Sequence, residues 1–385
     1  MTLATSFENA RTLFDLPADL TYLDAAALGP LPVDAAKAGN KGLEKKLHPW
    51  TMKSGTFFDD TRSLRPKLAG LLDAHQDCIS FVPAVSYGLA IAAQNLPVRR
   101  GSKILILAEQ FPSNVYTWRR LAQENSAELI TVSNEDGQSL TDAMVDAIDD
   151  QVSLIATAQV RWTDGALIDA ERVANKARAC GAATVFDLTQ SCGVLPFDTR
   201  TIQPDFAVAA GYKWLLGPYS LGFLYSAPKW HDGRPLEENW ISRKGSTDFT
   251  RLIDYTDTYD RGALRYDVGE RANFTLLPAL ESSVDLISSF GVDRISTHLR
   301  TLSDPLAVEL EEIGFTCLPP DLRPGHYLAA RLPENAPPEI PRRLAEDDIY
   351  ISQRGDWLRI SPHIYNTPED MDRCLEAITA LLCTA

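Results

Sequence analysis

The strongest constraint on the fold is an alternation of short apolar runs with longer helical patterns through the middle of the chain. Five such runs occupy residues 103–107, 128–132, 153–158, 183–186 and 206–209. Between two of them, residues 169–180 place Val173, Ala177 and other small apolar residues at helical spacing, and Gly181 follows as a stop. This order predicts repeated βαβ units, which build a mostly parallel sheet with helices on both faces.

The last part of the chain has a different pattern. Residues 276–290 show a long amphipathic helical pattern, and short strand patterns follow at 315–317, 327–332, 349–352 and 358–360. We therefore predict a large α/β domain over residues 16–275 and a smaller α+β domain made of residues 1–15 and 276–385. The proline-rich stretch 319–341 is expected to be an exposed loop.

Composition limits the partners and the compartment. The chain has 385 residues, 45% of them hydrophobic, which suffices for one or two cores without disulfides or metals. Its formal net charge is -15, so its field repels nucleic-acid backbones and anionic membrane surfaces. The six cysteines are scattered, which argues against a zinc site or a disulfide framework. No signal peptide or membrane-spanning stretch is expected, and a cytoplasmic location is predicted.

Three residues lie where parallel sheets bind ligands, outside the carboxyl ends of the strands. Asp187 directly follows an apolar run, where a buried carboxylate needs a partner, and a helix N-cap is the ordinary alternative. Lys213 lies in an apolar, aromatic stretch, so it is either a snorkelling side chain or a lysine with a lowered pKa, fit for Schiff-base chemistry. Ser86 precedes an apolar helical pattern and is either a plain N-cap or part of a phosphate cradle.

These residues belong to a longer series of motifs. The series runs Asp187-Leu188-Thr189-Gln190, Asp205-Phe206 and Gly211-Tyr212-Lys213, between Tyr22-Leu23-Asp24 near the start and Arg359-Ile360-Ser361-Pro362 near the end. It resembles the series of the class V aminotransferase superfamily, which includes cysteine desulfurases, kynureninases and isopenicillin N epimerase. The resemblance covers nearly the whole chain. It implies the fold type I architecture of pyridoxal phosphate (PLP) enzymes, with a mostly parallel seven-stranded sheet, and PLP as the cofactor.

The resemblance also implies roles for the matching residues. Lys213 would form the Schiff base with PLP and act as general base at the substrate's Cα. Asp187 would pair with the protonated pyridine nitrogen, and Gln190 would hydrogen-bond the phenolic oxygen of the ring. The phosphate would be held by residues from three segments, and these are Ala84, Val85, Ser86, Tyr212 and, at the partner subunit's site, Asn273.

Two further residues complete the expected site. Arg359 would bind the substrate α-carboxylate as a bidentate pair, with a surface ion pair as the alternative. Phe111 follows a strand end in a Phe-Pro-Ser sequence that resembles the kynureninase pattern, and it would stack on the cofactor ring, with core packing as the alternative. A homodimer with active sites at the subunit interface, acting on a small amino-acid substrate, is implied in the same way.

Departures from the family pattern bear on the reaction. Desulfurases carry a nucleophilic cysteine just before the substrate arginine, but residues 351–358 contain none. Persulfide-forming desulfuration is therefore not expected, because the thiolate is the agent of that step. Trp162 occupies the place of a desulfurase asparagine, Ala210 that of a serine and Glu270 that of a threonine, so that Asn273 is the candidate in the last segment.

We predict transamination or Cβ bond cleavage of an α-amino acid. Racemisation or epimerisation is an alternative that needs a second proton donor, for which Tyr87, Tyr116 and Gln110 are candidates by neighbourhood. A catalytically silent protein that kept the PLP fold is another. A nicotinamide dehydrogenase is disfavoured, because no G-x-G-x-x-G sequence follows a strand pattern.

Overall fold

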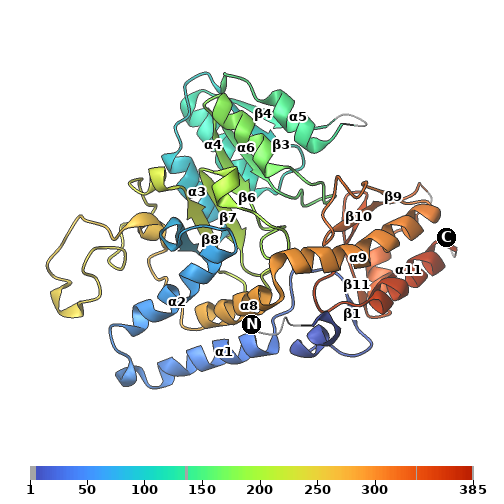
Figure 1. Ribbon diagram of the computed structural model, residues 1–385, viewed down its shortest axis with the longest axis horizontal. Helices are drawn as coiled ribbons and strands as arrows, with labels where there is room; N and C mark the ends of the chain where they lie inside the picture. The colour runs from blue at the N-terminus through green and yellow to red at the C-terminus, as the bar shows by residue number, and fades with distance from the viewer. Residues whose placement is uncertain (1–5, 135–137, 335, 384–385) are drawn as a thin grey trace.

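The computed structural model of the chain describes residues 6–134, 138–334 and 336–383. A larger and a smaller unit are joined by long helices (Figure 1). The larger unit contains a seven-stranded sheet of order β2-β8-β7-β6-β5-β3-β4, in which β8 runs antiparallel to both its neighbours and the other strands are parallel to one another. The strands are β2 Ile79–Val82, β3 Lys103–Leu107, β4 Glu128–Val132, β5 Val152–Ala158, β6 Ala183–Asp187, β7 Phe206–Ala210 and β8 Gly222–Ser226.

The predicted strands and the fold type I architecture are confirmed. The five runs found in the sequence are β3 to β7, with bounds that differ by at most one residue. The sequence interpretation missed β2 and β8, which are fully buried along their length. The reason is that β8 follows β7 through a loop rather than a crossover helix, and so falls outside the alternation that identified the other strands.

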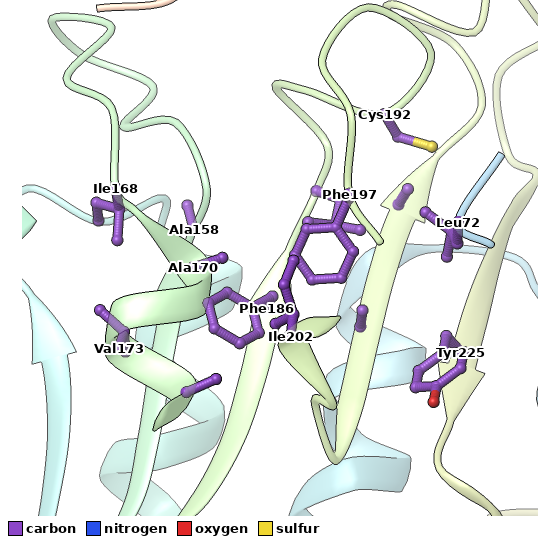
Figure 2. Close-up of a cluster of buried hydrophobic side chains, with 14 of the residues drawn as sticks. Leu72, Ala158, Ile168, Ala170, Val173, Phe186, Cys192, Phe197, Ile202 and Tyr225 are labelled. Carbon is purple, nitrogen blue, oxygen red and sulfur yellow. The ribbon is translucent and has the colours of Figure 1, made fainter. Parts of the chain in front are cut away.

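Both faces of the sheet are covered by apolar layers, because successive side chains of a strand point to opposite faces. Leu105 and Leu107 of β3 belong to one buried cluster, whereas Ile104 and Ile106 belong to the other. Figure 2 shows part of the first layer, where Phe186 of β6 packs near Phe197 with ring centroids 5.5 Å apart. The helices of this unit are α1 Val33–Glu44, α2 Thr56–Gly70, α3 Val85–Asn95, α4 Ser113–Asn125, α5 Leu140–Ala147, α6 Ala170–Ala179 and α7 Thr199–Ile202.

The smaller unit is an antiparallel sheet packed on helices. Its four-stranded sheet has the order β12-β13-β10-β9, and a separate parallel pair joins β1 to β11. These strands are β1 Thr21–Tyr22, β9 Thr316–Cys317, β10 Leu328–Arg331, β11 Ile349–Tyr350, β12 Ser352–Arg354 and β13 Trp357–Ile360. The helices are α8 Leu276–Phe290, α9 Val292–Glu312, α10 Ile340–Ala345 and α11 Pro368–Cys383.

Short 3-10 helices occupy several connections. They are η1 Phe7–Leu13, η2 Lys45–Leu47, η3 Pro49–Thr51, η4 Gln76–Cys78, η5 Pro228–Trp230, η6 Phe249–Arg251 and η7 Gly262–Tyr266. None of the helices in the described parts of the chain combines the length and the apolar character needed to cross a membrane.

Helix α8 contacts both units. Leu277 and Leu280 near its start belong to a cluster of the larger unit, whereas Ile287 and Phe290 near its end belong to the cluster of the smaller unit. Leu23, together with Ala25 and Ala26, also packs in the cluster of the smaller unit. We therefore propose that the units divide within α8 and after about residue 26, rather than at residues 276 and 16. Residues 1–5 of the predicted small domain lie outside the described residues.

The predicted exposed loop at 319–341 is wrong in its central part. Residues 323–330 are buried, and β10 pairs with β13 on one side and β9 on the other. The Arg323 guanidinium is 1% exposed and forms an ion pair with Asp304 of α9. The strand pattern predicted at residues 327–332 is confirmed as β10, so the expectation of an exposed loop over the whole stretch is what fails, because prolines mark turns without saying what lies between them.

Candidate active site

A cavity of about 320 Å³ lies at the carboxyl ends of the parallel strands. Segments that follow five of those strands line it, including Ala84 after β2, Phe111 after β3, Trp162 after β5, Asp187 at the end of β6 and Lys213 after β7. A parallel sheet brings these strand ends to one edge, which is where doubly wound folds bind their ligands. Among the site residues predicted from the sequence, Ala84, Val85, Ser86, Phe111, Asp187, Gln190, Tyr212 and Lys213 all line this cavity.

Lys213 is held in a poorly solvated position inside the cavity. Its side chain is 7% exposed, and its Nζ atom lies 5.8 Å from the ring centroids of both Phe111 and Tyr212. Burial, with a smaller contribution from the charge of Arg359, lowers the pKa of Lys213 to about 8, while Asp187 partly opposes the shift. The amine is not in solvent, so the snorkelling alternative is wrong. A buried lysine with a lowered pKa has a useful fraction of neutral amine near neutral pH.

Asp187 is the last residue of β6 and is buried at the floor of the cavity. Burial raises the pKa of its carboxyl group, while hydrogen bonds from Thr189 and the charge of Lys213 oppose the rise. The backbone N–H of Thr189 donates to Asp187 Oδ1 at 2.9 Å, but a turn follows rather than a helix. The helix N-cap alternative is therefore wrong.

The first turn of α3 lies at the cavity, which Ala84, Val85 and Ser86 line. Ala84 is the N-cap residue, with an extended backbone and no side-chain cap, and Ser86 lies inside the helix. The plain Ser N-cap alternative is therefore wrong. The leading N–H groups of a helix have no partner within it, and they attract anions together with the helix dipole. Ala84 and Ser86 are exposed at this point, as a phosphate cradle requires.

Gln190 is fixed at both ends of its amide. Its Oε1 accepts from Trp214 Nε1 at 2.8 Å, and its Nε2 donates to the Ala26 carbonyl at 3.1 Å. The backbone carbonyl of Gln190 accepts from the buried His326 ring at 2.7 Å. One amide hydrogen of Nε2 is left for a ligand, which fits a donor to a ring oxygen.

An aromatic pair forms one wall of the cavity. Phe111 is 39% exposed, so the core-packing alternative for this residue is wrong. Its ring meets Trp162 edge to face with centroids 5.3 Å apart. Trp162 Nε1 donates to the Glu109 carbonyl at 2.6 Å, which fixes the indole in place. The sequence interpretation noted Trp162 only as a departure from a family pattern and missed its place in the wall.

Arg359 lies in β13 and is 1% exposed, so the surface ion pair alternative is wrong. Its Nε and one terminal nitrogen donate to Ser352 Oγ at 3.0 and 2.8 Å, and the other terminal nitrogen donates to the Trp162 carbonyl at 3.1 Å. The carboxylate of Asp24 lies 3.7 Å away. Burial raises the pKa of Asp24, whereas its hydrogen bond with Ser352 and the charge of Arg359 oppose the rise.

Asn273 does not line the cavity of its own chain. Its Oδ1 accepts from the N–H groups of Thr275 and Leu276, at 3.2 and 2.9 Å, and so caps the start of α8. The side chain is exposed. Its proposed contact with the partner subunit's phosphate site stays a prediction.

A PLP molecule would find matching groups in this cavity. The open helix start suits a phosphate, the neutral form of Lys213 suits an aldehyde, and the buried Asp187 suits a protonated ring nitrogen. Gln110 also lines the cavity and is 7% exposed, and its buried Nε2 has no hydrogen-bond partner among the described residues. A buried amide of this kind is costly unless a ligand or water meets it.

Comparisons with known proteins agree with this arrangement. The family described as aminotransferase class-V matches residues 21–374. The chain is 25% identical to a probable cysteine desulfurase of Methanothermobacter thermautotrophicus, over 94% of this chain and 95% of that protein. It is 26% identical to an isopenicillin N epimerase of Amycolatopsis lactamdurans, over 98% and 99%. It is 25% identical to a kynureninase of Shouchella clausii, over 97% and 90%.

The fold is also shared with solved structures. A cysteine desulfurase from Thermococcus onnurineus NA1 superposes with a TM-score of 0.85 at 20% identity, covering 100% of both chains. A second structure, of a cystine C-S lyase in complex with cysteine persulfide, superposes with a TM-score of 0.84 at 17% identity, covering 94% of this chain and 98% of that one.

Proposed function

Because the chain belongs to the aminotransferase class-V family of PLP-dependent enzymes, we propose that it removes the Cα proton of a free α-amino acid and then carries out transamination or Cβ bond cleavage. PLP is its cofactor, and amino acids are the class of substrate on which such enzymes act. The proposed removal of the Cα proton is supported above all by one observation, the buried Lys213 in a cavity that Asp187 also lines, where burial lowers the pKa of the lysine to about 8.

Each residue is assigned one part in this proposal. PLP, when bound, supplies an electron sink that stabilises negative charge at Cα. Lys213 accepts and returns the proton at that carbon, and Asp187 keeps the ring nitrogen protonated. Gln190 would donate to the ring oxygen, and Phe111 would stack on the ring. The phosphate group would be held by the N–H groups of Ala84 and Val85, by Ser86 and Tyr212, and by the partner subunit's Asn273.

Arg359 orients the substrate. Its guanidinium is buried and preorganised by Ser352 and the Trp162 carbonyl, so a carboxylate meets a fixed donor group. The Asp24 carboxylate lies 3.7 Å from the Arg359 guanidinium. That ion pair is long enough for the guanidinium to accommodate a second carboxylate.

Persulfide-forming desulfuration is not part of the proposal, although one of the relatives and one of the solved structures described above are named as cysteine desulfurases. The segment 351–358 contains no cysteine, and no cysteine is among the described residues that line the cavity. Cys192 is buried, and burial raises the pKa of its thiol to about 12. A thiol in that state is a poor nucleophile.

Epimerisation remains the second candidate because of the epimerase relative. Of the three candidate proton donors, Gln110 is the one that lines the cavity in the described structure, whereas Tyr116 is 63% exposed elsewhere. A carboxamide does not release a proton near neutral pH. Loss of Cα deuterium with full retention of enantiomeric purity would exclude this candidate.

The proposal is tested by the absorption spectrum of the purified protein. The wild type is expected to be yellow, to bleach with borohydride, and to change its spectrum on addition of some amino acids. The variant Lys213→Ala should lack the borohydride-sensitive band and lose at least about 10³-fold in activity, because the base is gone. Lys37→Ala, at an exposed ion pair of α1, is the matched control and should resemble the wild type.

Products then separate the reactions. A 2-oxo acid and a pyridoxamine form would indicate transamination, whereas a fragment of the substrate side chain would indicate Cβ cleavage. A protein that stays colourless with added PLP, or one that responds to no amino acid, would overturn the proposal.

We also propose that the enzyme is a homodimer. Large apolar side chains are exposed in two segments, with Leu47 at 68%, Trp50 at 77%, Ile253 at 77% and Tyr255 at 95% exposure. The segments are linked by the packing of Phe57 on Phe249, with centroids 5.4 Å apart. Exposed apolar groups in this number mark a contact surface, and a second copy of the chain is the partner that symmetric enzymes use most often.

A further inference from the structure

A second cleft of about 680 Å³ adjoins the cavity that contains Lys213. The two share Gln110 and Trp162 in their walls. The larger unit contributes the segment around Glu109 to one side of the cleft, and the smaller unit contributes Arg354 and Trp357 to the other. A group that enters the cleft therefore lies between the two units and beside the reacting centre.

Arg354 carries a charge in this cleft that the described chain does not neutralise. It is half-buried, and its guanidinium carbon lies 5.6 Å from the centroid of the Trp162 ring. Its hydrogen bond within the structure goes to a backbone carbonyl, that of Gln353, at 2.7 Å. No carboxylate of the described residues lies within 4.0 Å of it, although Asp24 acts on it from further away.

The other charged residues of the cleft either have a partner or are exposed to solvent. Arg161 and Asp164 form a buried ion pair with each other. Glu109 accepts a hydrogen bond from Thr163 at 3.1 Å. Arg331 and Asp356 also line the cleft but are exposed to solvent. Arg354 is thus the half-buried cation of the cleft without a carboxylate partner of its own.

The strand register places Arg354 beside Arg359. Ser352 of β12 lies opposite Arg359 of β13, and residues two apart on a strand point to the same face. Arg354 therefore shares a face with Arg359, and their guanidinium carbons lie 5.6 and 6.0 Å from the same Trp162 ring centroid. The positive charge of each also helps to lower the pKa of Lys213, which places both near the reacting amine.

We propose that Arg354 binds the distal acidic group of the substrate, so that the enzyme prefers a dicarboxylic α-amino acid over its neutral counterparts. This inference relies on the proposed function, in which Arg359 takes the α-carboxylate. Two arginines near one indole ring match a molecule with two carboxylates, and a guanidinium fork suits each of them. The side chain would extend from Cα past Trp162 into the second cleft.

The first test measures binding from spectral titrations of the holoenzyme with L-aspartate and L-glutamate, each against its amide. The wild type should bind the better acid at least about tenfold more tightly than the matched amide, the gain expected of one charge-assisted pair. In Arg354→Gln the affinity for the acid should fall to within about threefold of the affinity for the amide, while the affinity for the amide stays the same. Arg342→Gln, which removes an exposed charge of α10, should keep the wild-type preference.

A second test does not depend on the reaction. Glutarate carries two carboxylates and butyrate one, so glutarate should raise the melting temperature of the wild type more than butyrate does, and this difference should vanish in Arg354→Gln. Equal binding of acids and amides, with a clear spectral response to both, would overturn this inference and leave the proposed function intact. A response to no amino acid would overturn the proposed function instead, and glutarate stabilisation that depends on Arg354 would still identify the subsite.

Discussion

At the scale of single residues, the chemistry is set by how the fold solvates each group. Lys213 and Asp187 share one cavity, yet burial moves their pKa values in opposite directions, down for the amine and up for the acid. Both shifts favour the neutral forms, because desolvation penalises charge. The neutral lysine is the reactive form, whereas Asp187 becomes useful when a cationic ring nitrogen restores its charge.

The lowered pKa of Lys213 predicts a pH dependence of cofactor loading. At pH 7 about a tenth of these lysines are neutral, against fewer than about one in a thousand for an ordinary lysine. The rate at which the apoprotein binds PLP should rise about tenfold per pH unit below 7 and level off above pH 8. Stopped-flow absorbance would measure this rate. A rate that keeps rising tenfold per unit beyond pH 9 would show that burial does not shift this amine.

Asp187→Asn tests the carboxylate without removing its contact with the backbone. The amide oxygen can still accept from the N–H of Thr189, so the melting temperature should change little. Activity should fall on the order of 10²-fold, since an amide cannot keep the ring nitrogen protonated. Asp205→Asn is the control with the opposite outcome, because Asp205 forms an ion pair with Lys229 and accepts from Trp230. In that variant the melting temperature should fall, and any loss of activity should follow from the loss of stability.

At the scale of elements, close packing of α1 against the start of α8 depends on a glycine. A Cβ atom at Gly42 would lie 1.7 Å from the Phe274 carbonyl oxygen, so no side chain fits there. Helix α8 in turn contacts the apolar clusters of both units. The contact lies next to Asn273, in the segment that leads into α8.

Gly42→Ala should destabilise the protein by about 1–3 kcal/mol, although alanine has the better helix propensity, because overpacking outweighs a gain of about 1 kcal/mol. Gly70→Ala in α2 is the matched control, since its Cβ would meet nothing within 4 Å. It should be neutral or stabilise by less than about 1 kcal/mol. Urea unfolding of both variants decides the question, and equal midpoints would show that α1 is free to move away.

At the scale of the whole molecule, the active site is built from segments that lie far apart in the sequence. Arg359 near the end of the chain contacts both Asp24 near the start and the backbone carbonyl of Trp162, which lies in the middle of the chain and lines the cavity. The two units therefore share the site, and the apolar segments around Trp50 and Tyr255 project to the left of the larger unit in Figure 1. We expect those segments to form the subunit interface.

The dimer proposal predicts the effect of a charge on that surface. Ile253→Glu should weaken dimerisation at least about tenfold, because an isolated charge is costly to bury in an apolar contact. Sedimentation at several protein concentrations would measure the shift toward monomer. Val308→Glu, which adds the same charge to exposed α9, should sediment like the wild type. Identical behaviour of both variants would place the interface elsewhere.

The sequence alone determined the parallel sheet, because buried strands and crossover helices leave local patterns that survive without knowledge of the partners. It also singled out Asp187 and Lys213 as candidate site residues, since a charged residue at the end of an apolar run or within an apolar stretch is costly to bury without a partner. Tertiary structure decided what depends on contacts between distant segments. Such contacts decide the place of β8 in the sheet and the burial of Arg323. They also bring Arg354 beside Trp162, 192 positions away in the sequence. Nothing in the local pattern of either residue encodes that meeting, because it is created by the packing of one unit on the other.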